Sequence, residues 1–217
     1  MRDLLNAAEM KAVDKRSIEE YGIPSLVLME RAALEVVKRA RELLEPGLSG
    51  NEALEHGPGR ERLLKERKRK TVWAVCGLGN NGADGAAAAR MLALQGFSAV
   101  ILLPSLEGKR SRELEVQLSV AEKLGIPILT LGDPLPEACD LIIDAVFGIG
   151  LSRPVEGVYK ELISFMEEKR QWELVPVAAV DMPSGISSDT GAVMGCAVKA
   201  DVTGTFGMRK GGQALVP

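Results

Sequence analysis

The chain has few histidines and cysteines, and each shortage excludes a class of function. It contains a single histidine, His56, among 217 residues. Catalytic triads and metal sites built on histidine are therefore excluded, so acid–base chemistry has to come from carboxylates, lysine, tyrosine or water. The three cysteines, Cys76, Cys139 and Cys196, lack the paired spacing of a zinc site or a disulfide framework. We expect reduced thiols in a cytoplasmic protein.

The chain also lacks a strong net charge and a long apolar run. The 27 Lys and Arg residues nearly balance the 30 Asp and Glu residues, which gives a net charge of −3. This balance argues against a dedicated nucleic-acid or anionic-membrane surface. No run approaches the roughly 18 apolar residues of a membrane span, and the N-terminus has no apolar signal core. The sequence therefore favours a small-molecule or protein partner.

Short apolar runs alternate with helical patterns along most of the chain. This alternation predicts an α/β fold, a Rossmann-like three-layer sandwich with a mostly parallel central sheet and two N-terminal helices. We expect one domain over 1–217, with N-terminal helices over 1–46, a flexible basic connector over 47–70 and the α/β core over 71–217. The second N-terminal helix is expected over 25–44, with Ser25 as its N-cap. The expected core strands are 71–76, 98–103, 127–130, 141–146, 175–180 and 202–206, and the core helices 86–95, 112–124 and 158–168.

The first predicted strand ends in a glycine-rich motif, CGLGNNGADG, at residues 76–85. Its Gly-x-Gly-x-x-Gly spacing is that of a dinucleotide-binding turn, but such a site also needs an acidic residue at the end of the second strand. Here the second strand runs into Pro-Ser-Leu, and Glu107 follows only after that turn. A nicotinamide-dependent oxidoreductase is therefore disfavoured.

The same motif still suits a ligand. Glycines let the backbone approach a bound molecule closely, and free N–H groups at the start of the next helix favour an anion such as phosphate. Asn80, Asn81 and Asp84 add side-chain oxygens and amides. For Asp84 the simpler alternative is a helix cap, because Asp is a preferred capping residue.

Two more carboxylates lie at the ends of predicted core strands. Asp144 interrupts the apolar strand 141–146, and Asp181 ends the strand 175–180 with Ser184 three residues later. A buried carboxylate is costly unless it is hydrogen-bonded, paired or bound to a cation. A structural hydrogen bond is the simpler alternative for Asp144, but oxygens from Asn81, Asp144 and Ser184 also suit a hard monovalent or divalent cation.

Four long segments, taken in order, resemble the YjeF N-terminal domain family, whose enzymatic members are NAD(P)H-hydrate epimerases. The segments are AAEMKAVDKRSIEEYGIPSLVLMERAA, CGLGNNGADGAAAARML, DAVFGIGLSRPVEG and AVDMPSGISSDTGAVMGCAVKADVTGTFGMRKGG. The resemblance implies an enzyme that interconverts the R and S forms of hydrated NADH or NADPH, in which water has added to the nicotinamide ring. It also implies a homodimer, and a separate or fused dehydratase that restores the S form.

The resemblance also assigns roles to individual residues. It implies substrate-binding loops at Asn80, Asn81, Gly82, Ala83 and Asp84 and at Gly148, Ile149, Gly150, Leu151, Ser152, Arg153 and Pro154. A further substrate contact falls on Asp181, which we take as the general acid–base group. The family's potassium ion falls on Asn81, Asp144 and Ser184, in agreement with their oxygen ligands.

One departure from the family pattern concerns Ala83, which stands where the family loop usually has glycine. We expect a steric cost there if the backbone angle φ is positive. The alternative function is a non-catalytic scaffold or nucleotide-binding module on the same fold. Presence of Asn81, Asp144, Asp181 and Ser184 together argues against it, because a scaffold does not need buried oxygen ligands at the binding edge of a sheet.

Overall fold

The computed structural model describes residues 5–45 and 69–206, and a six-stranded parallel sheet forms its centre. The strands lie in the order β3-β2-β1-β4-β5-β6, and every pairing is parallel. The α/β fold is thereby confirmed, with a sheet that is entirely rather than mostly parallel. The strands are β1 Thr71–Cys76, β2 Ser98–Leu102, β3 Ile128–Leu129, β4 Leu141–Ala145, β5 Val177–Val180 and β6 Val202–Gly204.

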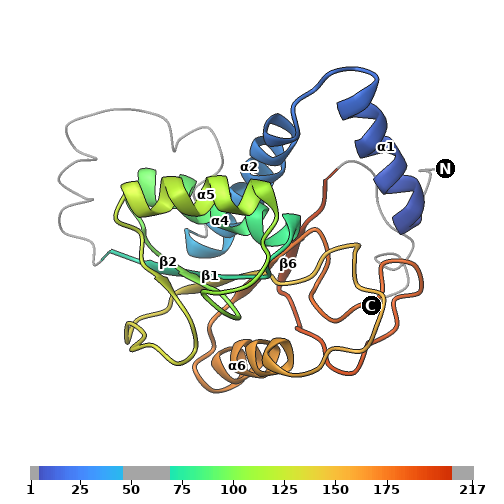
Figure 1. Ribbon diagram of the computed structural model, residues 1–217. Helices are drawn as coiled ribbons and strands as arrows, with labels where there is room; N and C mark the ends of the chain where they lie inside the picture. Colours follow the sequence, from blue (N-terminus) through green and yellow to red (C-terminus); the bar gives the residue numbers. More distant parts are fainter. Residues whose placement is uncertain (1–4, 46–68, 207–217) are drawn as a thin grey trace.

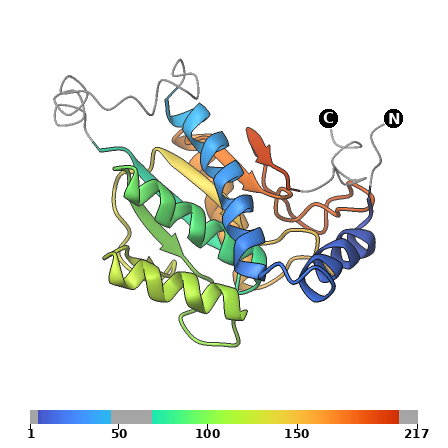
Figure 2. The ribbon, with the colours of Figure 1, turned by 90° about the horizontal axis from the view of Figure 1, so that it is seen from above.

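Helices cover both faces of this sheet. Figure 1 shows α2 (Ser25–Leu44), α4 (Asn80–Leu94) and α5 (Arg112–Lys123) on one face and α6 (Val158–Trp172) on the other. The first helix, α1 (Ala7–Glu19), stands beside the end of the sheet rather than over a face (Figure 2). The predicted three-layer arrangement with two N-terminal helices is confirmed.

The two helical layers enclose separate apolar cores. All six residues of β1 are buried, as expected for a parallel strand that is covered on both faces. Alanines of α4 and apolar residues of α2 and α5 pack on one side. On the other side, Trp73 of β1 stacks on Phe165 of α6 with ring centroids 5.7 Å apart. The sheet is therefore rigid where its strands end, and that rigidity positions the loops that follow them.

The strand order reverses between β1 and β4. The chain leaves β1 toward β2 on one side and later returns to β4 on the other side. In open parallel sheets, such a switch point leaves a crevice beyond the carboxyl ends of the two strands, and ligands bind there. The loops after β1 and β4 border this crevice.

Helix α4 begins earlier than the sequence predicts. It starts at Asn80 rather than at residue 86, and Gly79 precedes it as the N-cap in an extended conformation. The glycines of the motif favour a turn by propensity, but packing against the sheet overrides that preference. Ala83 is therefore helical. Among the described residues only Leu174 and Asp181 combine a side chain with a positive φ, so the steric cost expected at Ala83 does not arise.

Two other expectations concern the N-cap of α2 and the connector that follows this helix. Ser25 is not an N-cap: Pro24 holds that position without a side-chain bond, and the Ser25 hydroxyl instead donates to Glu113 of α5 at 2.7 Å. The connector lies outside the described residues over 46–68, and the division of the chain at 46 and 70 stays a prediction. In the described ranges, no helix is long and apolar enough to cross a membrane.

Gly82 lets α4 start close to the end of β1. A methyl group added at Gly82 would lie 1.8 Å from the carbonyl oxygen of Gly77, whereas one added at Gly79 would meet no atom within 4 Å. Neither glycine has a positive φ, so an alanine would not strain the backbone at either position. The two positions differ in the room available for an added methyl group.

We expect Gly82→Ala to lower the free energy of unfolding by about 3 kcal/mol, because the new methyl group forces α4 away from β1. This cost exceeds the gain of about 1 kcal/mol that Ala brings to a helix. Gly79→Ala is the matched control: it meets no atom and should cost only the less favourable N-cap, about 1 kcal/mol or less. Urea denaturation measures both. Equal unfolding midpoints for the two variants would show that the contact is not tight.

Candidate functional site

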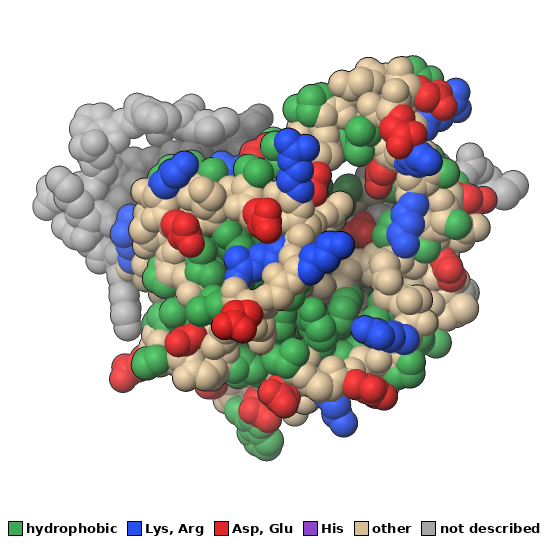
Figure 3. All heavy atoms as spheres, in the orientation of Figure 1, with side chains coloured by type: hydrophobic (Ala, Val, Ile, Leu, Met, Phe, Trp, Pro, Cys, Tyr) green, Lys and Arg blue, Asp and Glu red, His purple; other side chains and the backbone are tan. Residues whose placement is uncertain are grey.

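A cleft of about 1050 Å³ lies between the carboxyl edge of the sheet and the two N-terminal helices. The surface is hollowed beneath the projecting α1, with Lys and Arg side chains along the margin (Figure 3). Its walls come from α1 and α2, the start of α4, the loops after β1, β2 and β4, the first turns of α5 and α6, and the residues that follow β5 and β6. The predicted site residues among them are Asn80, Asn81, Asp84, Gly148, Ile149, Gly150 and Asp181.

Asp144 and Ser184 form a buried pair below this cleft. Both side chains are fully buried. The Ser184 hydroxyl donates to Asp144 Oδ1 at 2.5 Å, and the Ser184 backbone N–H donates to Oδ2 at 2.7 Å. Burial raises the pKa of Asp144 to about 6, although these hydrogen bonds act to lower it. The structure thus joins two of the three predicted metal ligands.

Asn81 and Asp181 meet above the backbone of Gly148. A methyl group added at Gly148 would lie 2.7 Å from Asn81 Oδ1 and 3.4 Å from Asp181 Oδ2. Any residue larger than glycine would therefore displace the Asn81 side chain. The Asn81 Nδ2 atom is buried and has no hydrogen-bond partner among the described residues. An orphaned buried donor next to a cleft is typical of a site completed by a ligand.

One short segment connects the two pairs. The Phe147 backbone N–H donates to the Ser184 hydroxyl at 2.9 Å, and the next residue is Gly148. Asp181 follows β5 directly and is 7% exposed. Its φ is 65°, a backbone conformation that residues other than glycine adopt at a cost in free energy. Such local strain at the end of a strand is common at functional sites. The four polar residues predicted from the strand ends are therefore gathered at one place.

The ligand chemistry of this place fits a weakly charged cation. Asp144 forms no salt bridge with any Lys or Arg of the described ranges. Those ranges also contain no group of three or more His, Cys, Asp or Glu side chains able to hold a metal. One carboxylate combined with hydroxyl and amide oxygens is a hard ligand set of low charge, which suits an alkali ion better than a transition metal.

Asp84 lies on the first turns of α4 and faces the same cleft. Burial, followed by the nearby carboxylates of Asp181 and Asp14, raises its pKa well above the usual value. It is the fifth residue of the helix, so the alternative that it caps α4 is wrong. Two carboxyl groups that differ in environment at one site can divide the roles of proton donor and acceptor.

The other predicted residues lie outside the cleft. Gly82 and Ala83 are buried in α4, where Ala83 packs into the apolar core. Ser152, Arg153 and Pro154 are exposed, and none of residues 151–154 lines this cleft. Contact of these residues with substrate stays a prediction.

Several residues of the cleft were not found from the sequence. Met10 of α1 and Arg31 of α2 form part of its wall, and Phe147 and Tyr159 pack beside it with ring centroids 4.9 Å apart. The helical periodicity predicts α1 and α2 as helices. Nothing in the pattern shows that they lie beside the sheet edge, so their residues were not predicted to line the cleft. The tyrosine is the second residue of α6, fourteen residues after the end of β4.

This fold and site define a doubly wound α/β protein with its site at the switch point of the sheet. Residues 25–212 match the family model described as YjeF-related protein N-terminus, so the chain belongs to this family. The relatives include the NAD(P)H-hydrate epimerase of Limosilactobacillus fermentum, which is 43% identical over 96% of this chain and 87% of its own length. The bifunctional NAD(P)H-hydrate repair enzyme Nnr of Thermofilum pendens is 33% identical over 97% of this chain, which spans 36% of that protein.

A solved structure supports the architecture. The crystal structure of yeast ynu0, YNL200c, superposes with a TM-score of 0.78 at 22% identity, over 99% of this chain and 84% of that chain. At this identity the likeness concerns the fold alone. The sequence resemblance to the family and the observed sheet therefore agree.

We expect Asp84→Asn to stabilise the protein at neutral pH. The pKa of Asp84 is higher in the folded chain than in the unfolded chain, so folding binds a proton and the wild type loses stability as pH rises above the unfolded value near 4. The neutral amide avoids this loss. The variant's advantage in urea denaturation should therefore be larger at pH 8 than at pH 4.5. An advantage that is independent of pH would contradict the raised pKa.

Proposed function

We propose that this chain is an NAD(P)H-hydrate epimerase, an isomerase that interconverts the R and S forms of hydrated NADH or NADPH. The observation that carries the proposal is the meeting of Asn81 and Asp181 across Gly148, at the switch point of the sheet and above the buried Asp144–Ser184 pair. The epimerase relatives that align along nearly the whole chain supply the substrate class. The scaffold alternative is not favoured, since an orphaned buried amide and several buried carboxyl groups serve no purpose there.

The chemistry of the substrate determines what the site must do. The hydrated ring carbon carries a hydroxyl beside the ring nitrogen, so it is a hemiaminal. When the hydroxyl accepts a proton and leaves as water, the nitrogen lone pair forms a C=N bond and the carbon becomes planar. Water then adds to either face and loses a proton. Ring opening at the same carbon is the other route, and it also needs a proton donor.

Asp181 is the general acid–base group of this scheme. It lines the cleft and lies next to Asn81, whose orphaned Nδ2 donor is free to hold a substrate oxygen. Asp84 has a raised pKa and therefore keeps a proton. This proton lies near Asp181 and is available for protonating the leaving hydroxyl. The carboxylates of Asp181 and Asp14 also favour the positive charge that develops on the planar ring.

The start of α4 holds the phosphate part of the substrate. The first N–H groups of a helix have no partner within the helix and favour an anion. Asn80 and Asn81 are the first residues of α4 and line the cleft. The loop at Gly148, Ile149 and Gly150 forms the opposite wall. The reacting ring is thereby kept close to Asp181.

Asn81, Asp144 and Ser184 hold a potassium ion in this proposal. Their oxygens form a hard ligand set of low charge. The Asp144 carboxylate is buried and forms no ion pair with a Lys or Arg among the described residues. When bound, the ion supplies a fixed positive charge that stabilises the loops after β4 and β5. The protein's own residues carry out the proton transfers.

Three further expectations belong to the same proposal. The chain acts as a homodimer, it works beside a dehydratase that restores the S form, and it resides in the cytoplasm. The relative named a bifunctional NAD(P)H-hydrate repair enzyme supports a link to a second repair activity. Three cysteines without a disulfide are in keeping with a reducing compartment.

Asp181→Asn should lower kcat for interconversion of the hydrates by about 10³-fold, because the amide neither donates nor accepts the proton. Binding of the hydrate should change less than about threefold, because the amide keeps the shape of the side chain. Chromatographic separation of R and S forms gives the rate, and calorimetry gives the affinity. Glu168→Gln, which removes an exposed carboxylate of α6, is the control. Near-normal turnover in Asp181→Asn would rule out this role for Asp181.

Potassium should raise the melting temperature by about 5 °C relative to tetramethylammonium at the same ionic strength, because a ligand that binds only the folded chain stabilises it. Asn81→Ala should lose this difference, since it removes one oxygen ligand and leaves the Asp144–Ser184 pair intact. Differential scanning calorimetry measures the shift. Equal melting temperatures in the two salts would argue that these residues hold no potassium.

A further inference from the structure

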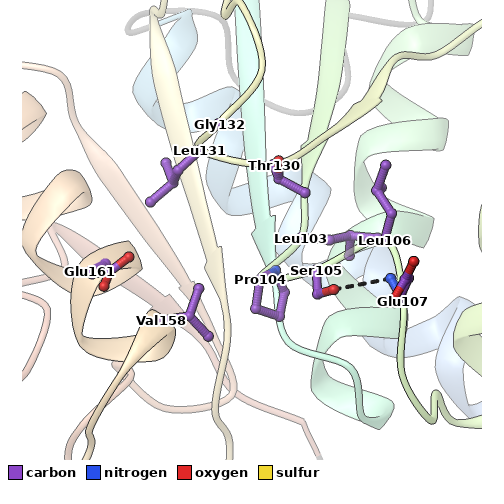
Figure 4. Close-up of a pocket in the computed structure, with 10 residues that line it drawn as sticks. All are labelled: Leu103, Pro104, Ser105, Leu106, Glu107, Thr130, Leu131, Gly132, Val158 and Glu161. Carbon is purple, nitrogen blue, oxygen red and sulfur yellow. Dashed lines mark hydrogen bonds between the residues drawn. The ribbon is translucent and has the colours of Figure 1, made fainter.

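A second cavity of about 420 Å³ lies beyond the carboxyl ends of β2 and β3. Figure 4 shows its residues, which come from the loop after β2, the loop after β3 and the first turn of α6. Its volume falls in the range of about 300–1,000 Å³ that is usual for small-molecule sites. The reaction scheme above does not use this cavity.

The cavity has the form of a slot with aliphatic walls and an acid on each side. Leu103 and Pro104 form one wall, and Leu131 and Val158 form the other. Glu107 lies on the β2–α5 loop at one side and Glu161 on α6 at the opposite side (Figure 4). Such a slot suits a flat heterocycle between aliphatic side chains, and its carboxylates accept hydrogen bonds from amino and hydroxyl groups.

The slot and the large cleft are bordered by the same two segments. In the β2–α5 loop, Glu107 lines the slot and Lys109 lines the cleft. At the start of α6, Val158 lines the slot and Tyr159 lines the cleft. The two cavities are therefore neighbours along both segments, and the β2–α5 loop contributes Lys109 to the cleft.

We infer that the slot binds the adenosine end of the hydrated dinucleotide, an inference that rests on the proposed function. The nicotinamide end lies at Asp181, the pyrophosphate passes the start of α4 and Lys109, and the adenine enters the slot. All exposed donors of adenosine, the amino group and the two ribose hydroxyls, match the acceptors of Glu107 and Glu161. In doubly wound dinucleotide-binding sheets the ribose of the adenosine also lies beyond the second strand, but its acid ends that strand, whereas Glu107 follows five residues after β2.

The charge of the slot favours hydrated NADH over hydrated NADPH. NADPH carries a phosphate on the ribose 2′-oxygen, where NADH carries a hydroxyl. A carboxylate accepts a hydrogen bond from the hydroxyl but repels the phosphate. The slot contains two carboxylates and no Lys or Arg among its lining residues within the described ranges. Hydrated NADH is therefore the preferred substrate.

The test compares the two hydrates as substrates of the wild type and of Glu107→Lys. The wild type should favour hydrated NADH by roughly 10-fold or more in kcat/KM, because like charges a few ångströms apart repel even when partly solvated. Glu107→Lys should remove or reverse this preference. Glu122→Lys makes the same charge change on an exposed residue of α5 that lines neither cavity, and it should leave the preference unchanged.

A binding measurement makes the inference independent of turnover. ADP-ribose should bind the wild type more tightly than its 2′-phosphate derivative does, by calorimetry, and Glu107→Lys should reverse the order. Val158→Phe, which fills the slot, should weaken binding of ADP-ribose but not of nicotinamide mononucleotide. If both hydrates epimerise equally well, the inference is wrong and the proposed function stands. If neither hydrate reacts but ADP-ribose binding depends on Glu107, the proposed function fails and the slot remains a nucleotide site.

Discussion

The hydrogen-bonded pair of Asp144 and Ser184 is the constraint on which the site depends. Asp144 is a carboxylate in the middle of a parallel sheet, and an unsatisfied group there would be very costly. Ser184 satisfies it with both its hydroxyl and its backbone N–H, and this ties the loop after β5 to β4. The same hydroxyl accepts from Phe147 and so positions the loop after β4. The ends of β4 and β5 are thereby held together at the crevice.

The site above this pair is acidic at its floor and basic near its margin. Asp181 and Asp84 face the cleft together, and burial and the nearby Asp181 carboxylate raise the pKa of Asp84. Lys109 and Arg31 contribute basic side chains to the walls of the same cleft. An uncharged ring that becomes cationic as it reacts suits the floor, and phosphates suit the margin. A dinucleotide with a damaged nicotinamide ring has these two properties.

Much of this arrangement could be predicted, because polar residues at the ends of apolar strands are uncommon and parallel strands bring their ends to one edge. Asp144, Asp181 and Asn81 were found in this way. The early start of α4 was not, since glycines 82 and 85 favour a turn locally and only contact with the sheet makes them helical. Nor was Glu107 recognised as a lining residue. The sequence places it after a turn, and only the path of that turn brings it beside the loop after β3.

The central claim is that this edge of the sheet changes the configuration of a hydrated nicotinamide ring. Its most direct test is to incubate the wild-type protein with the purified R form of hydrated NADH and to follow the S form by chromatography. We expect the mixture to reach the same ratio of R to S from either pure form, at a rate that rises in proportion to protein concentration. Equilibration no faster than in protein-free buffer would contradict it.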